Sequence, residues 1–302
     1  MNQRPPTLDP IAAARLARRA LPAVAASPWL HEEVARRMQE RLEWIRLQPK
    51  AWAHWDPLRG GLEAHALLAA RYPQSRAYLV EADPARARAA ARQLAPAWWK
   101  LWSGPRPQGV IEAPEGGVDM IWANMALHLA ADPQALIGRW HRALATDGFL
   151  MFSSFGPDTL RELRALYAAL AWPPAGPEFT DMHDWGDMLV NAGFAEPVMD
   201  MERITLTWTS ADALLAELRG LGANLHPQRF PALRGRAWLS RLRQELTRAL
   251  ADDQGRLALT FEIIYGHAVK PAPRLKVAPE SAVSLQDMRS LLRGSGPGRP
   301  SP

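Results

Sequence analysis

Apolar residues recur along this 302-residue chain in two patterns, one of which is helical. Residues 29–49, WLHEEVARRMQERLEWIRLQP, place apolar side chains at spacings of three and four. The resulting stripe consists of Leu30, Val34, Met38, Leu42 and Ile45. This spacing predicts an amphipathic helix that ends at Pro49, preceded by a first helical stretch from which Pro22 and Pro28 separate it.

The second pattern is a short run that is apolar nearly throughout, as expected of a parallel strand covered on both faces. RAYLVEADP, VDMIWANMAL and FLMFSSFG are runs of this kind, and helical segments such as DPQALIGRWHRALATDG stand between them. That segment begins at Asp132-Pro133 and is expected to end at Gly148. Alternating strands and helices predict an α/β fold, with a parallel sheet between two layers of helices.

Two further strands near the C-terminus break this alternation. EPVMDMERITLTW and LALTFEIIYGHAVK both have strand character, and the segment between them, about residues 210–250, is helical in pattern. We therefore divide the chain into an N-terminal helical segment (1–48) and an α/β domain (49–271) with a helical insertion. The tail (272–302) is rich in Pro, Ser and Gly, and we expect it to be disordered.

Composition excludes several kinds of site. The chain has no cysteine, which rules out disulfides, thiolate metal ligands and cysteine nucleophiles, and no set of iron ligands is evident. No apolar run reaches the roughly 18 residues that span a bilayer, so we expect a soluble, cytoplasmic protein without a membrane contact. The N-terminus is rich in Arg and Ala, as transit peptides are. The same residues are abundant along the whole chain, which favours a general compositional bias over a targeting signal.

The net charge of +5 either indicates an acidic partner or has no functional meaning. No nucleic-acid recognition motif accompanies it, so we expect no nucleic-acid partner.

One turn lies where many α/β proteins bind a nucleotide. HWDPLRGGLEAH, residues 54–65, connects a predicted strand to a predicted helix. Such a turn usually has three spaced glycines, whereas this one has only the adjacent Gly60 and Gly61. The side chains of residues 57–59 occupy positions where bare backbone is expected. The segment is therefore either an altered cofactor site or an ordinary strand-to-helix turn.

A longer stretch carries a family resemblance. VDMIWANMALHLAADPQALIGRWHRALATDGFLMFSSFGPDTLRELR resembles the class I S-adenosylmethionine-dependent methyltransferases. Within them it is similar to the malonyl-acyl-carrier-protein O-methyltransferases of biotin synthesis and to the related mitochondrial complex I assembly factor. FSSFGPDTLRELR is the most specific element. EEVARRMQERLEWIRLQP, WGDMLVNAGF and LTFEIIYGHAVKP match in the same order, so the resemblance covers about residues 10–271.

The resemblance implies a Rossmann-like sheet of seven strands, with N-terminal helices, a helical insertion before the last strand, and that last strand antiparallel. It implies S-adenosylmethionine as cofactor, bound at the carboxyl ends of the first strands. The activity would be methylation of the free carboxylate of a malonyl group on an acyl carrier protein, whose acidity would explain a basic surface. Two alternatives remain open: an inactive methyltransferase fold serving in assembly or interaction, and a hydroxylase-like role.

The family's cofactor-binding positions can be matched to residues of this chain, and the first of them follow the first predicted strand. There Asp56 or Glu63 would supply the acid, and Gly60 and Gly61 the positions of close backbone approach. Glu81, at the end of AYLVEADP, matches the acid that accepts hydrogen bonds from the two ribose hydroxyls.

Other cofactor positions are less complete. Asp83 is an alternate for the ribose acid. Asn124 and Met125 follow the fourth strand, where the family lines its reaction centre, and the Asn124 amide would orient cofactor or substrate. The family's acid near the adenine has no counterpart, because Glu112 lies too close to the next strand.

No acid–base residue is expected, because the accepting carboxylate is already ionised at neutral pH. Catalysis would come from alignment of the reacting atoms in a dry pocket. His128 is a candidate substrate contact, with a structural hydrogen bond as the alternative. Arg161 and Arg164 are candidates to hold the malonyl carboxylate, with a solvated helix face as the alternative.

The insertion carries the candidate surface for the carrier protein, and a solvated face is again the alternative. Its arginines are Arg229, Arg234, Arg236, Arg241 and Arg243. Three clustered tryptophans, Trp98, Trp99 and Trp102, are candidates for a lid or an apolar wall, or simply pack in the core.

Overall fold

The computed structural model describes residues 8–18, 27–96 and 104–273. Trp98, Trp99 and Trp102 lie outside the described residues, as does nearly all of the tail for which disorder is predicted. Among the helices that are described, none has the length and apolar character needed to cross a membrane.

A sheet of seven strands forms the centre of the described chain. The strands are β1 (Ala51–Trp55), β2 (Arg76–Val80), β3 (Gln108–Val110), β4 (Val118–Ala123), β5 (Leu144–Phe155), β6 (Ala195–Trp208) and β7 (Leu257–Val269). Their order across the sheet is β3-β2-β1-β4-β5-β7-β6. β7 pairs antiparallel with both β5 and β6, whereas the pairs from β3 to β5 are parallel. The predicted sheet is therefore confirmed.

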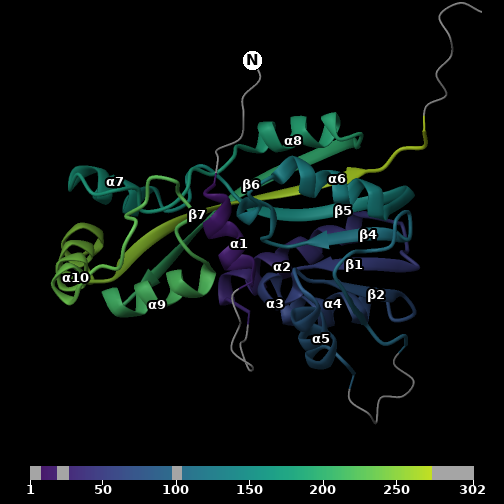
Figure 1. Ribbon diagram of the computed structural model, residues 1–302, viewed down its shortest axis with the longest axis horizontal. Helices are drawn as coiled ribbons and strands as arrows, with labels where there is room; N and C mark the ends of the chain where they lie inside the picture. The colour runs from purple at the N-terminus through teal and green to yellow at the C-terminus, as the bar shows by residue number, and fades with distance from the viewer. Residues whose placement is uncertain (1–7, 19–26, 97–103, 274–302) are drawn as a thin grey trace, which may run out of the picture. The chain divides into compact units, whose positions relative to one another are not determined.

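Helices cover both faces of the sheet because successive strand residues point to opposite sides. On one face lie α2 (Trp29–Arg41), α4 (Leu62–Arg71) and α5 (Pro84–Gln93), with Trp52 of β1 in the same core as α2 and α4. On the other lie α6 (Pro133–Ala143) and α8 (Met182–Asn191), which share a core with the next residue, Ala53. Figure 1 shows these two layers.

The stripe predicted for residues 29–49 is buried, since Leu30, Val34, Met38 and Leu42 have no exposed surface. The predicted helix end was wrong: α2 stops at Arg41, a 3-10 turn η1 (Leu42–Trp44) follows, and the chain then extends toward Pro49. The end predicted for α6 was also wrong, because the residues before Gly148 already belong to β5.

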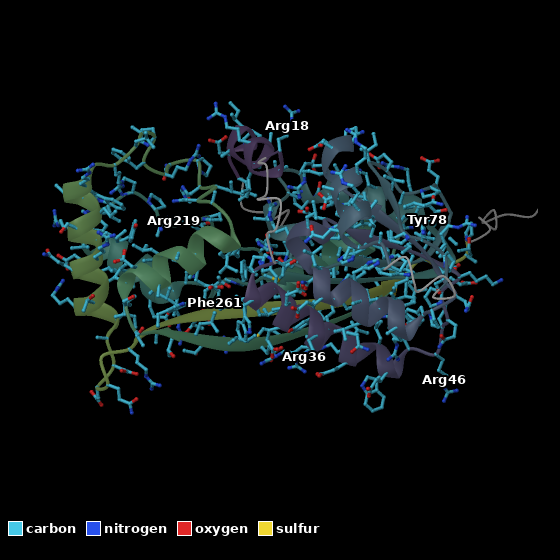
Figure 2. All side chains as sticks on the ribbon, turned by 90° about the horizontal axis from the view of Figure 1, so that it is seen from below. Arg18, Arg36, Arg46, Tyr78, Arg219 and Phe261 are labelled. Atoms are coloured by element: carbon cyan, nitrogen blue, oxygen red, sulfur yellow. The ribbon has the colours of Figure 1, made fainter. Side chains whose placement is uncertain are left out.

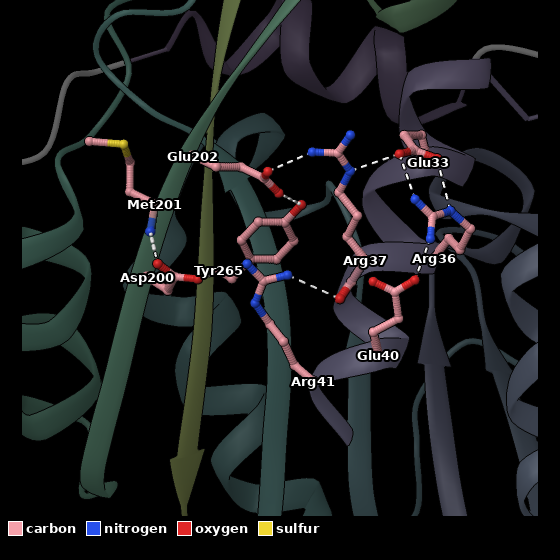
Figure 3. A network of polar contacts seen from close by, with 9 residues as sticks. All are labelled: Glu33, Arg36, Arg37, Glu40, Arg41, Asp200, Met201, Glu202 and Tyr265. Atoms are coloured by element: carbon pink, nitrogen blue, oxygen red, sulfur yellow. Dashed lines mark hydrogen bonds and ion pairs between the residues drawn. The ribbon is translucent and has the colours of Figure 1, made fainter. Parts of the chain in front are cut away.

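A polar network holds α2 against the C-terminal strands (Figure 3). Arg37 donates to Glu33 at 2.7 Å and to Glu202 of β6 at 2.5 Å. The Tyr265 hydroxyl of β7 donates to the same Glu202 at 2.7 Å, and the Arg41 guanidinium lies 3.8 Å from the centre of the Tyr265 ring. The N-terminal helical segment is thus bonded to strands more than 150 positions later in the chain.

The remaining helices gather beyond the carboxyl ends of the parallel strands (Figure 1). They are α1 (Pro10–Arg18), α3 (Pro57–Gly60), the 3-10 turn η2 (Leu127–Leu129), α7 (Arg161–Ala169), α9 (Ala211–Leu221) and α10 (Arg236–Leu250). The insertion predicted as helical consists of α9 and α10 with an irregular segment, residues 222–235, between them.

Candidate functional site

The acids that follow β1 and β2 lie side by side and share one arginine. Glu81 has a fully buried side chain, and its Oε1 accepts a hydrogen bond from the Leu58 N–H at 3.1 Å. Arg86 donates through Nε to Glu81 Oε2 and through Nη2 to Asp56 Oδ1, each at 2.7 Å. Both oxygens of the predicted ribose-binding acid are therefore bonded within the protein.

Arg86 reaches this position from the first turn of α5. Asp83 caps that helix by accepting from the N–H groups of Ala85 and Arg86, so the alternate acid serves the helix end. Burial, and next the neighbouring Asp56 carboxylate, raise the pKa of Glu81 to about 8.

The turn after β1 is a single helical turn, α3, and its side chains are directed inward. Leu58 and Arg59 are buried. A Cβ on Gly60 would lie 2.7 Å from the Asn124 carbonyl oxygen, so this glycine permits close contact with the protein's own β4 end. Gly61 has φ +140°, a conformation that favours glycine. The predicted close approach thus exists at Gly60, but it is to protein backbone.

An acid that the sequence analysis missed caps the next helix. Glu32 of α2 accepts from the N–H groups of Leu62, Glu63 and Ala64 at 2.7 to 3.1 Å. This carboxylate occupies the N-terminus of α4, where an anionic ligand group would be favoured. Glu63 itself is exposed at that helix end, and its role as the acid of the site stays a prediction.

Arg59 connects the turn after β1 to the N-terminal helix. Its Nη2 donates to the Leu16 carbonyl of α1 at 3.1 Å, and Nη1 lies 3.4 Å from Asp56 Oδ2. At the other end of α1, Asp9 pairs with Arg229 at 2.7 Å. α1 therefore links the predicted cofactor turn to the insertion.

Asn124 and Met125 are bonded within the protein. The Asn124 amide donates to the His31 carbonyl at 2.8 Å and also to the Gly60 carbonyl, and its oxygen accepts from the Ser153 hydroxyl at 2.6 Å. The Met125 side chain lies in the core. In this structure Asn124 joins α2, α3 and β5, and its contact with a cofactor stays a prediction.

A cavity of about 480 Å³ lies between η2, α7 and the helices of the insertion. Most of its wall is apolar: Leu129, Phe155, Leu160, Leu163, Leu215, Leu218, Leu221, Leu225, Leu239, Leu242 and Phe261 contribute to it. Figure 2 labels Phe261 of β7 and Arg219 of α9, which line it from two elements on the same side of the molecule. The cavity adjoins the ends of β4 and β5, so it lies where a methyl acceptor is expected.

His128 lines this cavity and is almost completely buried. The Phe155 N–H donates to its Nδ1 over a long 3.5 Å, which leaves the proton on Nε2. Burial lowers the pKa of His128 well below its ordinary value, so the ring is a neutral donor. Nε2 has no hydrogen-bond partner among the described residues.

The predicted arginines do not form one cluster. Arg161 and Arg164 are absent from the cavity wall: the first pairs with Asp158 and Glu162, and the second donates to the Pro157 carbonyl. Arg219, which the sequence analysis missed, lines the cavity.

The arginines of the insertion have different surroundings. Arg229 pairs with Asp9, and Arg243 pairs with Asp212 at 2.6 Å. Arg234 stacks on Trp238 and Phe230 with its Cζ 4.1 and 4.3 Å from the ring centres. Arg236 and Arg241 are exposed, and Arg241 lies over Trp172.

Comparison with known proteins decides the family. A malonyl-[acyl-carrier protein] O-methyltransferase of Gallionella capsiferriformans is 41% identical over 83% of this chain and 87% of that protein. The enzyme of the same name from Laribacter hongkongensis is 38% identical over 81% of this chain and 84% of its own length. This chain belongs to the malonyl-[acyl-carrier protein] O-methyltransferase family. No family model matches the chain.

Solved structures agree with this family at the level of fold. The YcgJ protein of Bacillus subtilis superposes with a TM-score of 0.51 at 12% identity, over 80% of this chain and 99% of that one. A protein of Bacillus halodurans gives a TM-score of 0.50 at 13% identity, over 80% of this chain and 100% of that one. The predicted family and the Rossmann-like methyltransferase fold are confirmed.

S-adenosylmethionine is the cofactor that this family implies, and the described residues fit its ribose on one condition. Glu81 ends β2, and a carboxylate there can accept both ribose hydroxyls. In this structure the Glu81 side chain is fully buried, and Arg86 and the Leu58 N–H each occupy one of its roughly four acceptor positions. The condition is therefore that the carboxylate becomes accessible, which requires its neighbours to move.

Proposed function

We propose that this chain methylates the free carboxylate of a malonyl group held as a thioester on an acyl carrier protein, with S-adenosylmethionine as methyl donor, in the cytoplasm and in biotin synthesis. The observation that carries the proposal is the 41% identity over 83% of the chain to an enzyme named for that reaction. The methyl donor supplies an electrophilic methyl group on a sulfonium centre.

Glu81 is the residue to hold the donor. Its carboxylate ends β2 beside the acid that ends β1, and both are within reach of Arg86. Binding then requires an exchange, in which Arg86 gives up Glu81 and keeps Asp56. We expect this exchange to weaken the affinity for the donor relative to a site whose acid is free.

The acceptor needs orientation more than proton transfer. A malonyl carboxylate is ionised at pH 7, so no general base has to act. The cavity beside η2 has mostly apolar walls, and the neutral His128 ring lies in one of them. We place His128 there as a residue that shapes the binding site.

The insertion is the surface for the carrier protein. Arg236 and Arg241 are exposed on α10, and Leu233 is fully exposed in the segment before it, with Phe230 also exposed. Basic side chains around exposed apolar ones suit an acidic helix that also presents apolar contacts. This surface adjoins the cavity through Trp238, so a thioester arm has a short path inward.

The direct test is methyl transfer by the full chain. We expect an acyl carrier protein loaded with malonyl to gain the mass of one methyl group when incubated with S-adenosylmethionine. The same carrier loaded with acetyl, which has no free carboxylate, is the control and should not change. Absence of both methyl transfer and S-adenosylmethionine binding would favour the inactive-scaffold alternative.

A further inference from the structure

A second, smaller hollow adjoins the cavity at the insertion. This hollow, which we call the entry pocket, has a volume of about 230 Å³. The residues that line both it and the larger cavity are Tyr167, Ala175, Asn224 and Trp238. The other residues of its wall are Pro174, Arg229, Phe230, Ala232 and Arg234. Because Phe230 is exposed, the entry pocket lies between the surface of the insertion and the apolar cavity.

The wall of the entry pocket carries positive charge without a matching acid. Arg229 and Arg234 line it, and among the described residues no Asp or Glu does so. Asp9, which is not part of the wall, pairs with Arg229 at 2.7 Å. The Arg234 side chain has no ion pair or hydrogen bond with any residue of the described ranges. The Arg234 charge is therefore available to a ligand, and the low-dielectric wall beside it strengthens its attraction for an anion.

Aromatic stacking holds the Arg234 guanidinium in place. Its Cζ lies 4.1 Å from the centre of the Trp238 ring and 4.3 Å from that of the Phe230 ring. Stacking uses the faces of the planar guanidinium, whereas its N–H donors point outward from the edge. An arginine that is already held loses less side-chain entropy on binding, and its fork matches two oxygens of one phosphate group. Arg234 thus has the geometry of a phosphate-binding residue.

The position of Arg234 indicates which phosphate it binds. The methyl acceptor is expected beside the ends of β4 and β5, where His128 and Phe155 line the cavity but not the entry pocket. An acyl carrier protein holds its acyl group on a phosphopantetheine arm, which begins at a phosphodiester on the carrier and ends at the thioester. With the malonyl group in the cavity, the phosphodiester belongs on the outer side, toward the carrier. Arg234 lies on that side, next to the fully exposed Leu233 of the proposed carrier surface.

We propose that the entry pocket binds the phosphodiester of the carrier's phosphopantetheine arm and that Arg234 is the residue that contacts it. This inference deepens the proposed function and rests on it for the identity of the ligand as a carrier-bound thioester. The arm then passes Trp238 into the cavity, so Arg234 sets the depth at which the malonyl group is held.

A phosphate added to a small thioester tests the site without methyl transfer. Malonyl-pantetheine and the methyl phosphodiester of malonyl-phosphopantetheine differ only in the phosphate group. Both are titrated into the full chain by calorimetry, with no methyl donor present. A hydrogen bond to a charged group corresponds to roughly ten- to a hundredfold in affinity, so we expect the phosphodiester to bind at least about tenfold more tightly. Equal affinities overturn the inference.

Three variants assign this preference to a residue. Arg234→Gln should abolish the preference for the phosphodiester and leave the affinity for malonyl-pantetheine unchanged. Arg234→Lys retains the charge but lacks the planar fork, so it should retain only part of the preference. The control is Arg248→Gln, because Arg248 is exposed, pairs with Glu245 and lines neither hollow; its preference should equal that of the natural chain. A full preference in Arg234→Gln overturns the inference.

Coenzyme A thioesters present the same arm on a diphosphate, so the source of the phosphate is tested separately. Malonyl-carrier protein and malonyl-coenzyme A are titrated into the natural chain and Arg234→Gln. We expect the natural chain to bind malonyl-carrier protein more tightly than malonyl-coenzyme A, and Arg234→Gln to weaken the carrier at least about tenfold. Equal or tighter binding of malonyl-coenzyme A overturns the assignment to a carrier arm.

Methyl transfer separates this inference from the proposed function. Methylation of malonyl-carrier protein with the same kcat/KM by the natural chain and Arg234→Gln overturns the inference and leaves the proposed function standing. A preference for the phosphodiester that depends on Arg234, without methylation of any malonyl thioester, leaves the phosphodiester site standing and overturns the proposed function.

Discussion

Arg86 Nε lies 2.7 Å from Glu81 Oε2, and this ion pair closes the position where the family's fold receives a ribose. The same guanidinium pairs with Asp56, so two carboxylates at the ends of adjacent strands share one cation. The pair stabilises the turn after β1, because Glu81 also fixes the Leu58 N–H. The protein's own contacts and the ribose of the cofactor therefore compete for the Glu81 carboxylate.

Removal of Arg86 should destabilise the fold. Arg86→Ala leaves the buried Glu81 carboxylate without its cation, and breaking a buried ion pair costs about 3 to 5 kcal/mol. Arg88→Ala, on the exposed side of the same helix, is the control and should stay within about 0.5 kcal/mol of the natural chain. Chemical denaturation measures both. Equal stability of the two variants would show that the pair is not important to the fold.

Donor affinity should increase with pH. The pKa of Glu81 is raised to about 8, mainly by burial, and its ionised form accepts hydroxyl hydrogen bonds about twice as strongly as its protonated form. Affinity for S-adenosylmethionine should therefore rise from pH 7 to pH 9. Glu81→Gln, which cannot ionise, should show a flat profile in the same calorimetric series. A flat profile in the natural chain would exclude Glu81 from the binding equilibrium.

Acid should destabilise the protein through its buried histidines. Burial lowers the pKa of both His31 and His65 from 6.5 to about 4. Between these values the folded state binds fewer protons than the unfolded state, so stability is lost as the pH falls from 6.5 toward 4. At pH 4 each group costs on the order of 3 kcal/mol.

The histidine prediction is checked by melting temperatures between pH 7.5 and 4.5. His65→Phe retains a ring near Trp52 and removes one titrating group. Its melting temperature should therefore fall less than that of the natural chain as the pH is lowered. His183→Gln alters an exposed histidine and should follow the natural curve. Identical curves for all three proteins would contradict the assignment.

Charge reversal on α10 should slow capture of the carrier protein. Arg236→Glu with Arg241→Glu places repulsion where an acidic helix is expected, and exposed charges act mainly on encounter. The association rate should fall and lose most of its salt dependence, since the Debye length decreases from about 10 Å at 0.1 M to about 3 Å at 1 M.

Stopped-flow measurement across a salt series checks the charge reversal. The control is Arg46→Glu, because Arg46 is exposed and lies at the far side from Arg219 in Figure 2. If both variants associate like the natural chain, the insertion is only a solvated face.

The sheet was predictable because each buried strand is a continuous apolar run. Trp122 and Phe152 lie in such runs, and both are fully buried. Helix ends were less predictable, since hydrogen bonds decide them: Lys270 and Gly148 pair through their backbones, which draws the residues after α6 into β5.

The site was predictable in position but not in its bonds. Glu81 ends its strand as the sequence indicates, yet nothing in the pattern shows that Arg86, five residues later, turns back to it. Glu32 is harder still, since it caps α4 across 30 positions of sequence. A ligand role depends on which partners a polar atom already has, and only the folded structure defines those partners.

One titration tests the central claim, that this chain binds S-adenosylmethionine at Glu81 against competition from Arg86. S-adenosylmethionine is titrated at pH 9 into the natural chain, Glu81→Gln and Arg86→Gln. A hydrogen bond to a charged group contributes about 1.5 to 3 kcal/mol, which is roughly ten- to a hundredfold in affinity. We predict that Glu81→Gln binds more weakly than the natural chain by at least tenfold and that Arg86→Gln binds more tightly by about tenfold. Equal affinities in the three proteins, or no binding in the natural chain and Arg86→Gln, would contradict the account.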